Sequence, residues 1–166
     1  MTTKNGTTGW TQNGESLTPD GKPTGNIYHL SVDYGRSVED GVKAGRYDWV
    51  DSDITSYNFP TKRKGRAEVA VELINFNRYI SDNEVFSELN TPDYRPAELH
   101  ELLALGEKYP GVKRDFPVVA LGSVWRVLYG FRGVPSIFRR GLGRSLVPFW
   151  VGSSWDGFFW FAAVRK

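Results

Sequence analysis

The side chains best suited to metal or acid-base chemistry in this sequence are few and scattered. It has two histidines and no cysteine. His29 lies in a β-prone run and His100 in a predicted helix, and neither has a second histidine at ligand spacing. Asp48, Asp51 and Asp53 could ligate a hard cation, but the glycine and glutamate of a calcium loop do not follow in register. We therefore expect structural roles for the histidines and capping or turn roles for the aspartates.

Phosphate-binding and nucleophile motifs are similarly incomplete. The glycine-containing run 141–144 is too short for a phosphate-binding fingerprint, and no helix is predicted after it. Ser123, Ser153 and Ser154 lack a neighbouring histidine motif that would activate them. The sequence thus predicts a protein that is not an enzyme and has neither cofactor nor catalytic metal, while a structural calcium or magnesium ion stays open.

The C-terminal segment 120–166 differs chemically from the rest of the chain. Asp156 is its only acid, and its cations are Arg126, Arg132, Arg139, Arg140, Arg144, Arg165 and Lys166. Four of the six tryptophans also lie here: Trp125, Trp150, Trp155 and Trp160. Arginine and aromatic side chains are enriched at binding hot spots. We therefore interpret this segment as a recognition surface.

Length and composition predict one soluble domain. A chain of 166 residues can bury a single core without disulfides. The composition of residues 1–25, rich in Thr, Gly and Asn, predicts a flexible tail. The domain is expected to comprise residues 26–166. The sequence shows neither a signal-peptide apolar region nor a run of 18 apolar residues. The expected location is cytoplasmic or virion-associated, without a membrane partner; secretion is not excluded.

Local patterns predict short helices and strands in mixed order. Capping residues Ser37 and Ser81 should begin two helices, which end near Gly45 and Leu89 respectively. A third helix, with a stripe of leucines, should have Pro96 in its first turn and end near Lys108. Strands are expected at 27–34, 68–76, 118–121 and 159–164, and the last of these should pair with the strand at 68–76. The glycine-containing segment 126–160 should form short strands and long loops. Together these elements predict an α+β fold.

Two stretches carry a more specific pattern. The first is Arg95-Pro96-Ala97-Glu98-Leu99-His100-Glu101-Leu102-Leu103-Ala104-Leu105-Gly106, followed by Tyr109-Pro110 and the run 119–125. The second is Gly130-Phe131-Arg132-Gly133-Val134-Pro135, followed by Arg144-Ser145-Leu146, Trp150, Trp155-Asp156-Gly157 and the ending 161–166. Together they resemble the variable proteins of diversity-generating retroelements, in the group with a C-type lectin fold related to formylglycine-generating enzymes.

The resemblance implies a C-type lectin fold with short helices, a small and mostly antiparallel sheet, and long irregular C-terminal loops. It also implies that a reverse transcriptase diversifies the C-terminal coding segment by errors at template adenines. The implied scaffold positions are Gly130, Arg132, Val134, Pro135, Leu146, Trp150, Trp155, Phe161 and Val164. The positions between them, within about 126–160, would form the variable ligand-binding face.

The genetic code offers an independent check of the resemblance. Asparagine codons randomised at their adenines cannot yield Lys, Glu, Gln, Met or Trp, and none of these occurs between Arg126 and Phe149. The chain also departs from the family pattern: Trp160 stands where an arginine is common, and Pro148 where a leucine is common. Pro148 removes a hydrogen-bond donor, which puts strand pairing there in doubt. Enzymatic relatives need cysteine or several histidines, which this chain lacks.

The expected binding face consists of residues that should lie together on one exposed surface. They are Leu128, Tyr129, Phe131, Gly133, Ser136, Phe138, Arg139, Arg140, Ser145, Val147, Phe149, Val151, Gly152, Ser153, Phe158 and Phe159. Trp125, Trp150, Trp155 and Phe161 are expected in the core. The expected ligand is a protein surface. The sequence leaves the oligomeric state open and slightly favours a monomer. The alternative is single-stranded nucleic acid or another anion, since arginines among aromatics also form such grooves.

Overall fold

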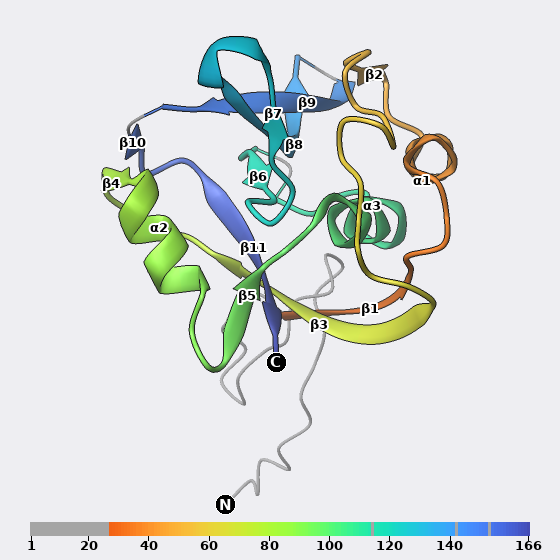
Figure 1. Ribbon diagram of the computed structural model, residues 1–166, viewed down its shortest axis with the longest axis horizontal. Helices are drawn as coiled ribbons and strands as arrows, with labels where there is room; N and C mark the ends of the chain where they lie inside the picture. The colour runs from red at the N-terminus through yellow and green to blue at the C-terminus, as the bar shows by residue number, and fades with distance from the viewer. Residues whose placement is uncertain (1–26, 114, 142, 153) are drawn as a thin grey trace, which may run out of the picture.

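The computed structural model describes residues 27–113, 115–141, 143–152 and 154–166. They form a mixed α+β structure in which short helices accompany a large sheet (Figure 1), so the predicted class is confirmed. In chain order the elements are β1 (Ile27–Asp33), α1 (Val38–Gly45), β2 (Trp49–Val50), β3 (Arg66–Ile74), β4 (Ile80–Ser81), α2 (Asp82–Leu89), β5 (Tyr94–Pro96), α3 (Leu99–Lys108), β6 (Val118–Val119), β7 (Trp125–Arg126), the 3-10 turn η1 (Leu128–Gly130), β8 (Arg132–Arg140), β9 (Gly143–Val151), β10 (Ser154–Trp155) and β11 (Trp160–Arg165). The predicted tail, residues 1–25, lies outside the described residues.

A sheet of nine strands dominates the described part of the chain. Its order is β1-β3-β11-β6-β8-β9-β2, with β5 also paired to β11 and β7 to β8. The expectation of a small sheet is therefore wrong, because strands distant in sequence join one sheet. Most pairs are antiparallel, as predicted, while β11–β6 and β2–β9 are parallel. The predicted pairing of the last strand with residues 68–76 is confirmed, since Phe161 faces Ile74 and Val164 faces Val71.

Two hydrophobic clusters bury both faces of the central strands. One contains the α3 residues Leu99 and Leu102 and the other the α2 residues Val85 and Leu89. In Figure 1, α1 and α3 lie to the right of the central strands and α2 to the left. Successive strand residues face opposite sides. In β8, for example, Val134 joins the α2 cluster and Ile137 the α3 cluster.

The helices begin largely where local capping predicts. Ser37 and Ser81 accept hydrogen bonds from Asp40 N (3.1 Å) and Glu84 N (3.3 Å), which satisfies donors that a helix leaves unpaired. The helix expected from Pro96 instead begins at Leu99. Residues 94–96 form β5 against β11, so pairing with the sheet delays the helix. No helix in the described residues is long and apolar enough to cross a membrane.

The segment predicted to be short strands and long loops contains a long hairpin instead. Strands β8 and β9 have nine residues each and remain in register, with Pro135 opposite Pro148. The Pro135 carbonyl accepts a hydrogen bond from Ala120 N, on the side away from β9. Because the nitrogen and the carbonyl of one residue in an antiparallel strand point to the same side, the Pro135 nitrogen also faces away from β9. The Leu146 carbonyl accepts a hydrogen bond from Asp51 N, so the backbone groups of Leu146 point toward β2. The backbone of Pro148, two residues further along β9, points to the same side but lies beyond the end of β2. The doubt about pairing at Pro148 is thus resolved, because its missing donor points to the outer edge of the strand.

Candidate ligand-binding surface

The structure divides the predicted binding residues by exposure instead of gathering them on one face. Five are exposed: Leu128, Tyr129, Phe131, Gly152 and Phe158. Five are half-buried: Phe138, Arg139, Phe149, Val151 and Phe159. Four are buried: Gly133, Ser136, Ser145 and Val147. Ser153 lies outside the described residues, and Arg140 is described only as a backbone position ending β8.

The four buried positions correct the expectation of a single exposed face. Ser136 and Ser145 lie in the middle of the hairpin, where β6 flanks one strand and β2 the other. Ser136 Oγ donates to the Val147 carbonyl at 2.9 Å, so its hydroxyl is committed inside the protein. A Cβ atom on Gly133 would lie 3.4 Å from the Trp125 ring and 3.5 Å from the Trp150 ring. These positions therefore support the fold and cannot contact a ligand without rearrangement.

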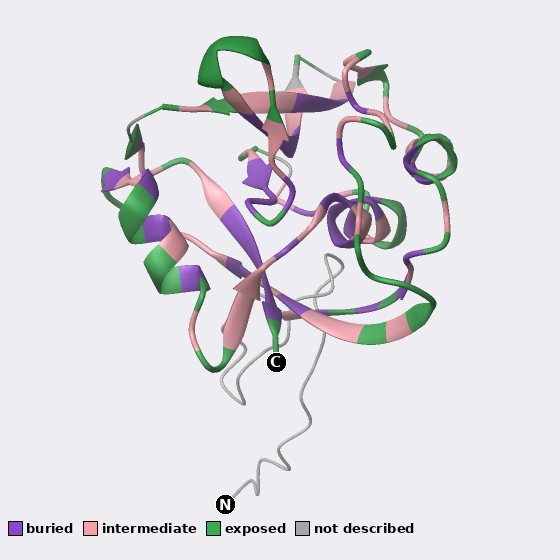
Figure 2. Cartoon of the chain, viewed as in Figure 1, coloured by how far each residue is buried: buried purple, intermediate pink, exposed green. Residues whose placement is uncertain are grey.

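Four large apolar side chains lie at the open end of the hairpin, and we call them the η1 patch: Leu128, Tyr129, Phe131 and Trp150. Their exposed fractions are 81%, 96%, 63% and 54%. The Phe131 and Trp150 rings meet edge to face, with centroids 6.3 Å apart. The sequence predicts Trp150 in the core, and the structure contradicts this prediction. In Figure 2 the loop between β7 and β8 stands out at the top as an exposed segment.

The backbone of the η1 patch is closed and locally strained. Val127 N donates to the Phe131 carbonyl at 2.8 Å, which ties the two ends of the turn together. Tyr129 has φ 68° and ψ 16°, a left-handed conformation that costs a non-glycine residue about 1–2 kcal/mol. Its ring nevertheless makes almost no contact with the protein. A strained, exposed tyrosine contributes nothing evident to the core, and such outliers motivate a hypothesis of function.

A row of aromatic rings connects the η1 patch to the protein interior. The Trp150 ring lies 5.9 Å from that of Trp125, which lies 6.3 Å from that of Phe59. Phe59 is 2% exposed. The row thus passes from solvent to the core through half-buried Trp125, so the exposed rings stand on a packed support. Rigid support reduces the entropy lost when a surface binds its ligand.

A second aromatic cluster accounts for the half-buried phenylalanines. Phe149 packs against Phe138 and Phe159 at centroid distances of 5.6 and 5.4 Å, and Phe159 packs edge to face on Trp155 at 4.8 Å. Trp155 is 5% exposed and its Nε1 donates to Asp82 Oδ1 at 2.6 Å. These rings extend the α2 cluster toward solvent. Their first role is packing, in contrast to the η1 patch.

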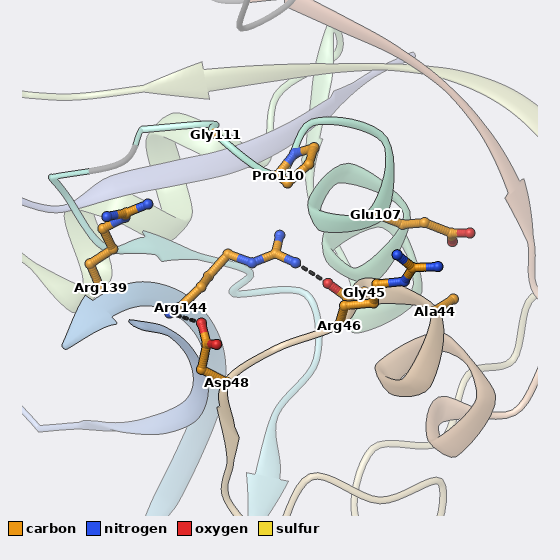
Figure 3. Close-up of a pocket in the computed structure, with 9 residues that line it drawn as sticks. All are labelled: Ala44, Gly45, Arg46, Asp48, Glu107, Pro110, Gly111, Arg139 and Arg144. Atoms are coloured by element: carbon orange, nitrogen blue, oxygen red, sulfur yellow. Dashed lines mark hydrogen bonds between the residues drawn. The ribbon is translucent and has the colours of Figure 1, made fainter. Parts of the chain in front are cut away.

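The other end of the hairpin is held by Arg144. Its guanidinium donates to the Gly45 carbonyl (Figure 3). It also donates to the Gly106 carbonyl and stacks 4.3 Å over the Tyr47 ring. Gly45 ends α1 and Gly106 lies in the last turn of α3, where carbonyl groups lack helical donors and carry partial negative charge. Arg144 N also donates to Asp48 Oδ2 at 2.7 Å. We call Arg144 with Tyr47, Gly45 and Gly106 the Arg144 anchor; sequence reasoning counted Arg144 only as a charge.

The cavity beside the Arg144 anchor has a mixed lining. It measures about 580 Å³, and Arg46, Arg139 and Arg144 line it together with Asp48 and Glu107. Arg144 already directs its donors at helix carbonyls, and the carboxylates offset the remaining cations. This arrangement stabilises the hairpin more directly than it would attract an anion. Arg139, a predicted ligand-binding residue, lies across the strand pair from Arg144.

The other polar residues form structural networks. Glu101 is fully buried, accepts from Tyr34 Oη at 2.7 Å and pairs with Arg95 at 2.5 Å. Burial, and then the hydrogen bond to Glu101, raise the pKa of Tyr34 to about 12. His100 Nε2 lies 3.1 Å from the Arg36 carbonyl. Among the described residues, no three His, Cys, Asp or Glu side chains are grouped to hold a metal ion.

Comparison of the chain with models of protein families, with curated proteins and with solved structures finds no match.

Proposed function

We propose that this protein is a binding module that contacts a protein ligand through the η1 patch. The observation that carries the proposal is the exposure of Leu128, Tyr129 and Phe131 at a supported turn, beside the exposed Trp150 of β9. Exposed apolar clusters of this kind mark interaction sites, and Tyr and Trp are frequent hot-spot residues. The strained Tyr129 adds to the argument, because its ring has no other evident use.

The charges beside the η1 patch favour a partner with acidic groups around an apolar centre. Arg126 and Arg132 face each other across β7 and β8, and Arg126 is exposed. Like charges directly opposite one another in a sheet are destabilising. An acidic rim on the ligand would relieve that repulsion and would steer the encounter. Neither a cofactor nor a catalytic step belongs to this proposal.

The proposal extends to the origin of the surface: a retroelement-diversified display protein with a C-type lectin fold. The support is the sequence pattern described above, together with the exposure of several positions in its variable segment. Exposed substitutions away from caps usually change stability by only about 0.5 kcal/mol. Diversified positions should therefore be the exposed ones, such as Leu128, Tyr129 and Phe131. The buried Ser136 and Ser145 should be fixed.

A display experiment tests the surface without knowledge of the natural ligand. One library randomises Leu128, Tyr129, Phe131 and Trp150, and a matched library randomises Gly133, Ser136, Ser145 and Val147. Both are selected for folding and for binding to hen lysozyme as a test antigen. We expect folded binders from the first library and mostly unfolded chains from the second. Equal loss of folding in both, or folded η1 variants without binders, would refute the proposed surface.

Nucleotide sequence and salt dependence test the remaining parts. A nearby imperfect repeat that differs from the C-terminal coding region almost only at adenines, beside a reverse transcriptase gene, would support diversification. Mismatches spread over all four bases would refute it. Tight, steeply salt-dependent binding of oligo-dT, lost when Arg126 and Arg132 are changed to Gln, would favour the nucleic-acid alternative over a protein ligand.

A further inference from the structure

An aromatic pocket separate from the η1 patch lies where three loops meet. It measures about 410 Å³, a size suited to a small ligand. Its walls are Tyr79, Phe116, Phe158 and Trp160, with Asp156, Asn75, Asn77 and Gly157 between them. We infer that this aromatic pocket binds a small quaternary ammonium ion, a ligand class different from the protein partner of the η1 patch.

Hydrogen bonds hold the loops of the aromatic pocket in place. Asn75 Nδ2 donates to the carbonyls of Gly157 (2.8 Å) and Phe159 (2.9 Å), which ties the end of β3 to the turn before β11. Asn75 Oδ1 accepts from Asn77 N at 3.0 Å. Trp160 N donates to the Pro117 carbonyl at 2.9 Å, which fixes the third loop. The loops that carry the walls are therefore preorganised, and a ligand need not order their backbone.

Three of the four rings of the aromatic pocket are exposed to solvent. Tyr79 is 76% exposed, Phe158 65% and Phe116 37%. Phe116 and Phe158 stack with centroids 6.2 Å apart and an interplanar angle of 24°. Lys113 Nζ lies 3.9 Å from the centroid of the Trp160 ring, so a cation can lie against a wall of the pocket, although the Lys113 charge itself opposes a second cation. Aromatic faces attract cations, and groups of such rings recognise quaternary ammonium ions.

The charge of the lining favours a cation over an anion. Asp156 is the one charged side chain among the described residues that line the pocket, and its Oδ1 accepts from Phe158 N at 2.8 Å. A primary ammonium group is strongly hydrated and needs hydrogen-bond acceptors, which aromatic rings supply poorly. A quaternary ammonium ion has no N–H groups to satisfy. Aromatic walls with one carboxylate therefore match a quaternary ammonium ion best.

A titration with choline and its neutral isostere 3,3-dimethylbutan-1-ol separates charge recognition from apolar contact. We expect choline to saturate the full chain, with its N-methyl protons shifted upfield by the rings in NMR spectra. The isostere should bind about ten-fold more weakly, since it lacks the cation–π term. Equal affinities would overturn the inference, and so would the absence of choline binding.

Variants locate the binding and connect it with individual side chains. Asp156→Asn keeps the acceptor for Phe158 N and should weaken choline about five-fold, in line with a partly exposed ion pair. Lys113→Gln should tighten binding about two-fold by removing a nearby positive charge. Phe158→Leu should weaken it, whereas Tyr57→Leu, at a 93% exposed ring outside the pocket, should not. Unchanged affinity in both Asp156→Asn and Phe158→Leu would overturn the assignment.

Two further arms distinguish the source of the ammonium group and the two sites. Sedimentation with phosphatidylcholine vesicles, competed by choline, would assign a lipid headgroup to the same pocket. Choline binding without sedimentation would assign a free ion. Both outcomes support the inference. Simultaneous substitution of Leu128, Tyr129 and Phe131 by Ser should leave choline binding unchanged, so this test stands apart from the η1 patch; a loss of choline binding in that variant would contradict the assignment to the aromatic pocket.

Discussion

At one end of the β8–β9 hairpin an arginine lies against two helices, whereas at the other end four large apolar side chains face solvent. The guanidinium of Arg144 meets carbonyls of Gly45 and Gly106. At the opposite end, Tyr129 is 96% exposed and Trp150 54%. Both ends are built from the arginine and aromatic residues that distinguish the C-terminal segment. Composition alone therefore does not tell an anchor from an exposed surface.

The difference between the two ends comes from what lies next to each. Near the hairpin tip, the ends of α1 and α3 supply carbonyl groups that need donors. Near η1, β9 extends past β2, and β8 pairs with the short strand β7, whose Trp125 packs against the Trp150 ring. A fixed end and an exposed end on the same two strands let side chains project rigidly. Changes at the exposed end should therefore affect binding, and changes at the anchored end should affect folding.

The largest effect is expected where the hairpin passes over the core. Leu146 and Trp150 lie on the same face of β9, but Leu146 is fully buried and Trp150 is half exposed. Leu146→Ala should lower the free energy of unfolding by about 2–5 kcal/mol, while Trp150→Ala should cost about 1 kcal/mol although it removes more atoms. Urea denaturation measures both. A larger loss for Trp150→Ala would show that its ring belongs to the core.

The Arg144 anchor should respond to substitution more strongly than the residue opposite it. Arg144→Ala removes two charge-assisted hydrogen bonds and a cation–π contact, which predicts a loss of about 2–3 kcal/mol in the free energy of unfolding. Arg139→Ala, at the paired position of β8, is the matched control and should cost less than about 1 kcal/mol. Equal losses, measured by thermal and urea denaturation, would show that Arg144 does not anchor the hairpin.

The smallest effect is expected at Tyr47, whose ring lies under Arg144. Its hydroxyl oxygen is buried without a hydrogen-bond partner among the described residues. Tyr47→Phe keeps the ring and removes this cost, so it should raise the free energy of unfolding by about 1 kcal/mol at neutral pH. A decrease would indicate that the hydroxyl is satisfied in solution.

Alkaline pH sharpens the Tyr47 test. Burial raises the pKa of Tyr47 from its usual 10.0 to about 12. Between these two pH values the folded state retains the Tyr47 proton while the unfolded chain loses it. The contribution of protonated Tyr47 to the free energy of unfolding is therefore complete below pH 10 and declines between pH 10 and 12. The advantage of the Phe variant over the wild type should grow across that interval. A constant difference would contradict the raised pKa.

Local chemistry allowed several elements to be predicted, and non-local pairing explains the failures. Ser37 and Ser81 begin their helices as expected because a cap needs partners only three residues away. The leucine stripe of α3 is likewise buried. The start of α3 was misplaced because β5 pairs with β11, which lies far along the chain. The hairpin was missed because its glycines and prolines suggested loops, whereas its register places Pro148 at an open edge.

The candidate site was predicted in part for the same reason. The sequence indicated that the C-terminal segment is rich in recognition residues, and Leu128, Tyr129, Phe131 and Phe158 are indeed exposed. It did not show that Ser136 and Ser145 are buried, because that depends on β6 and β2 flanking the hairpin. Nor did it show the aromatic pocket, whose walls come from three separate loops.

The sequence by itself determined the kinds of side chain available, the capped helix starts and the β-prone strands, since these depend on residues a few positions apart. The tertiary structure decided which arginine anchors the β8–β9 hairpin and which tryptophan is buried. Arg144 donates a hydrogen bond to Gly45, which lies 99 positions away in the sequence, and Trp155 donates one to Asp82, which lies 73 positions away. Arg139 and Trp150 have the same chemistry, yet Arg139 is half-buried and Trp150 is exposed. Burial depends on neighbours that the folded chain brings together, and short-range patterns do not encode which neighbours those will be.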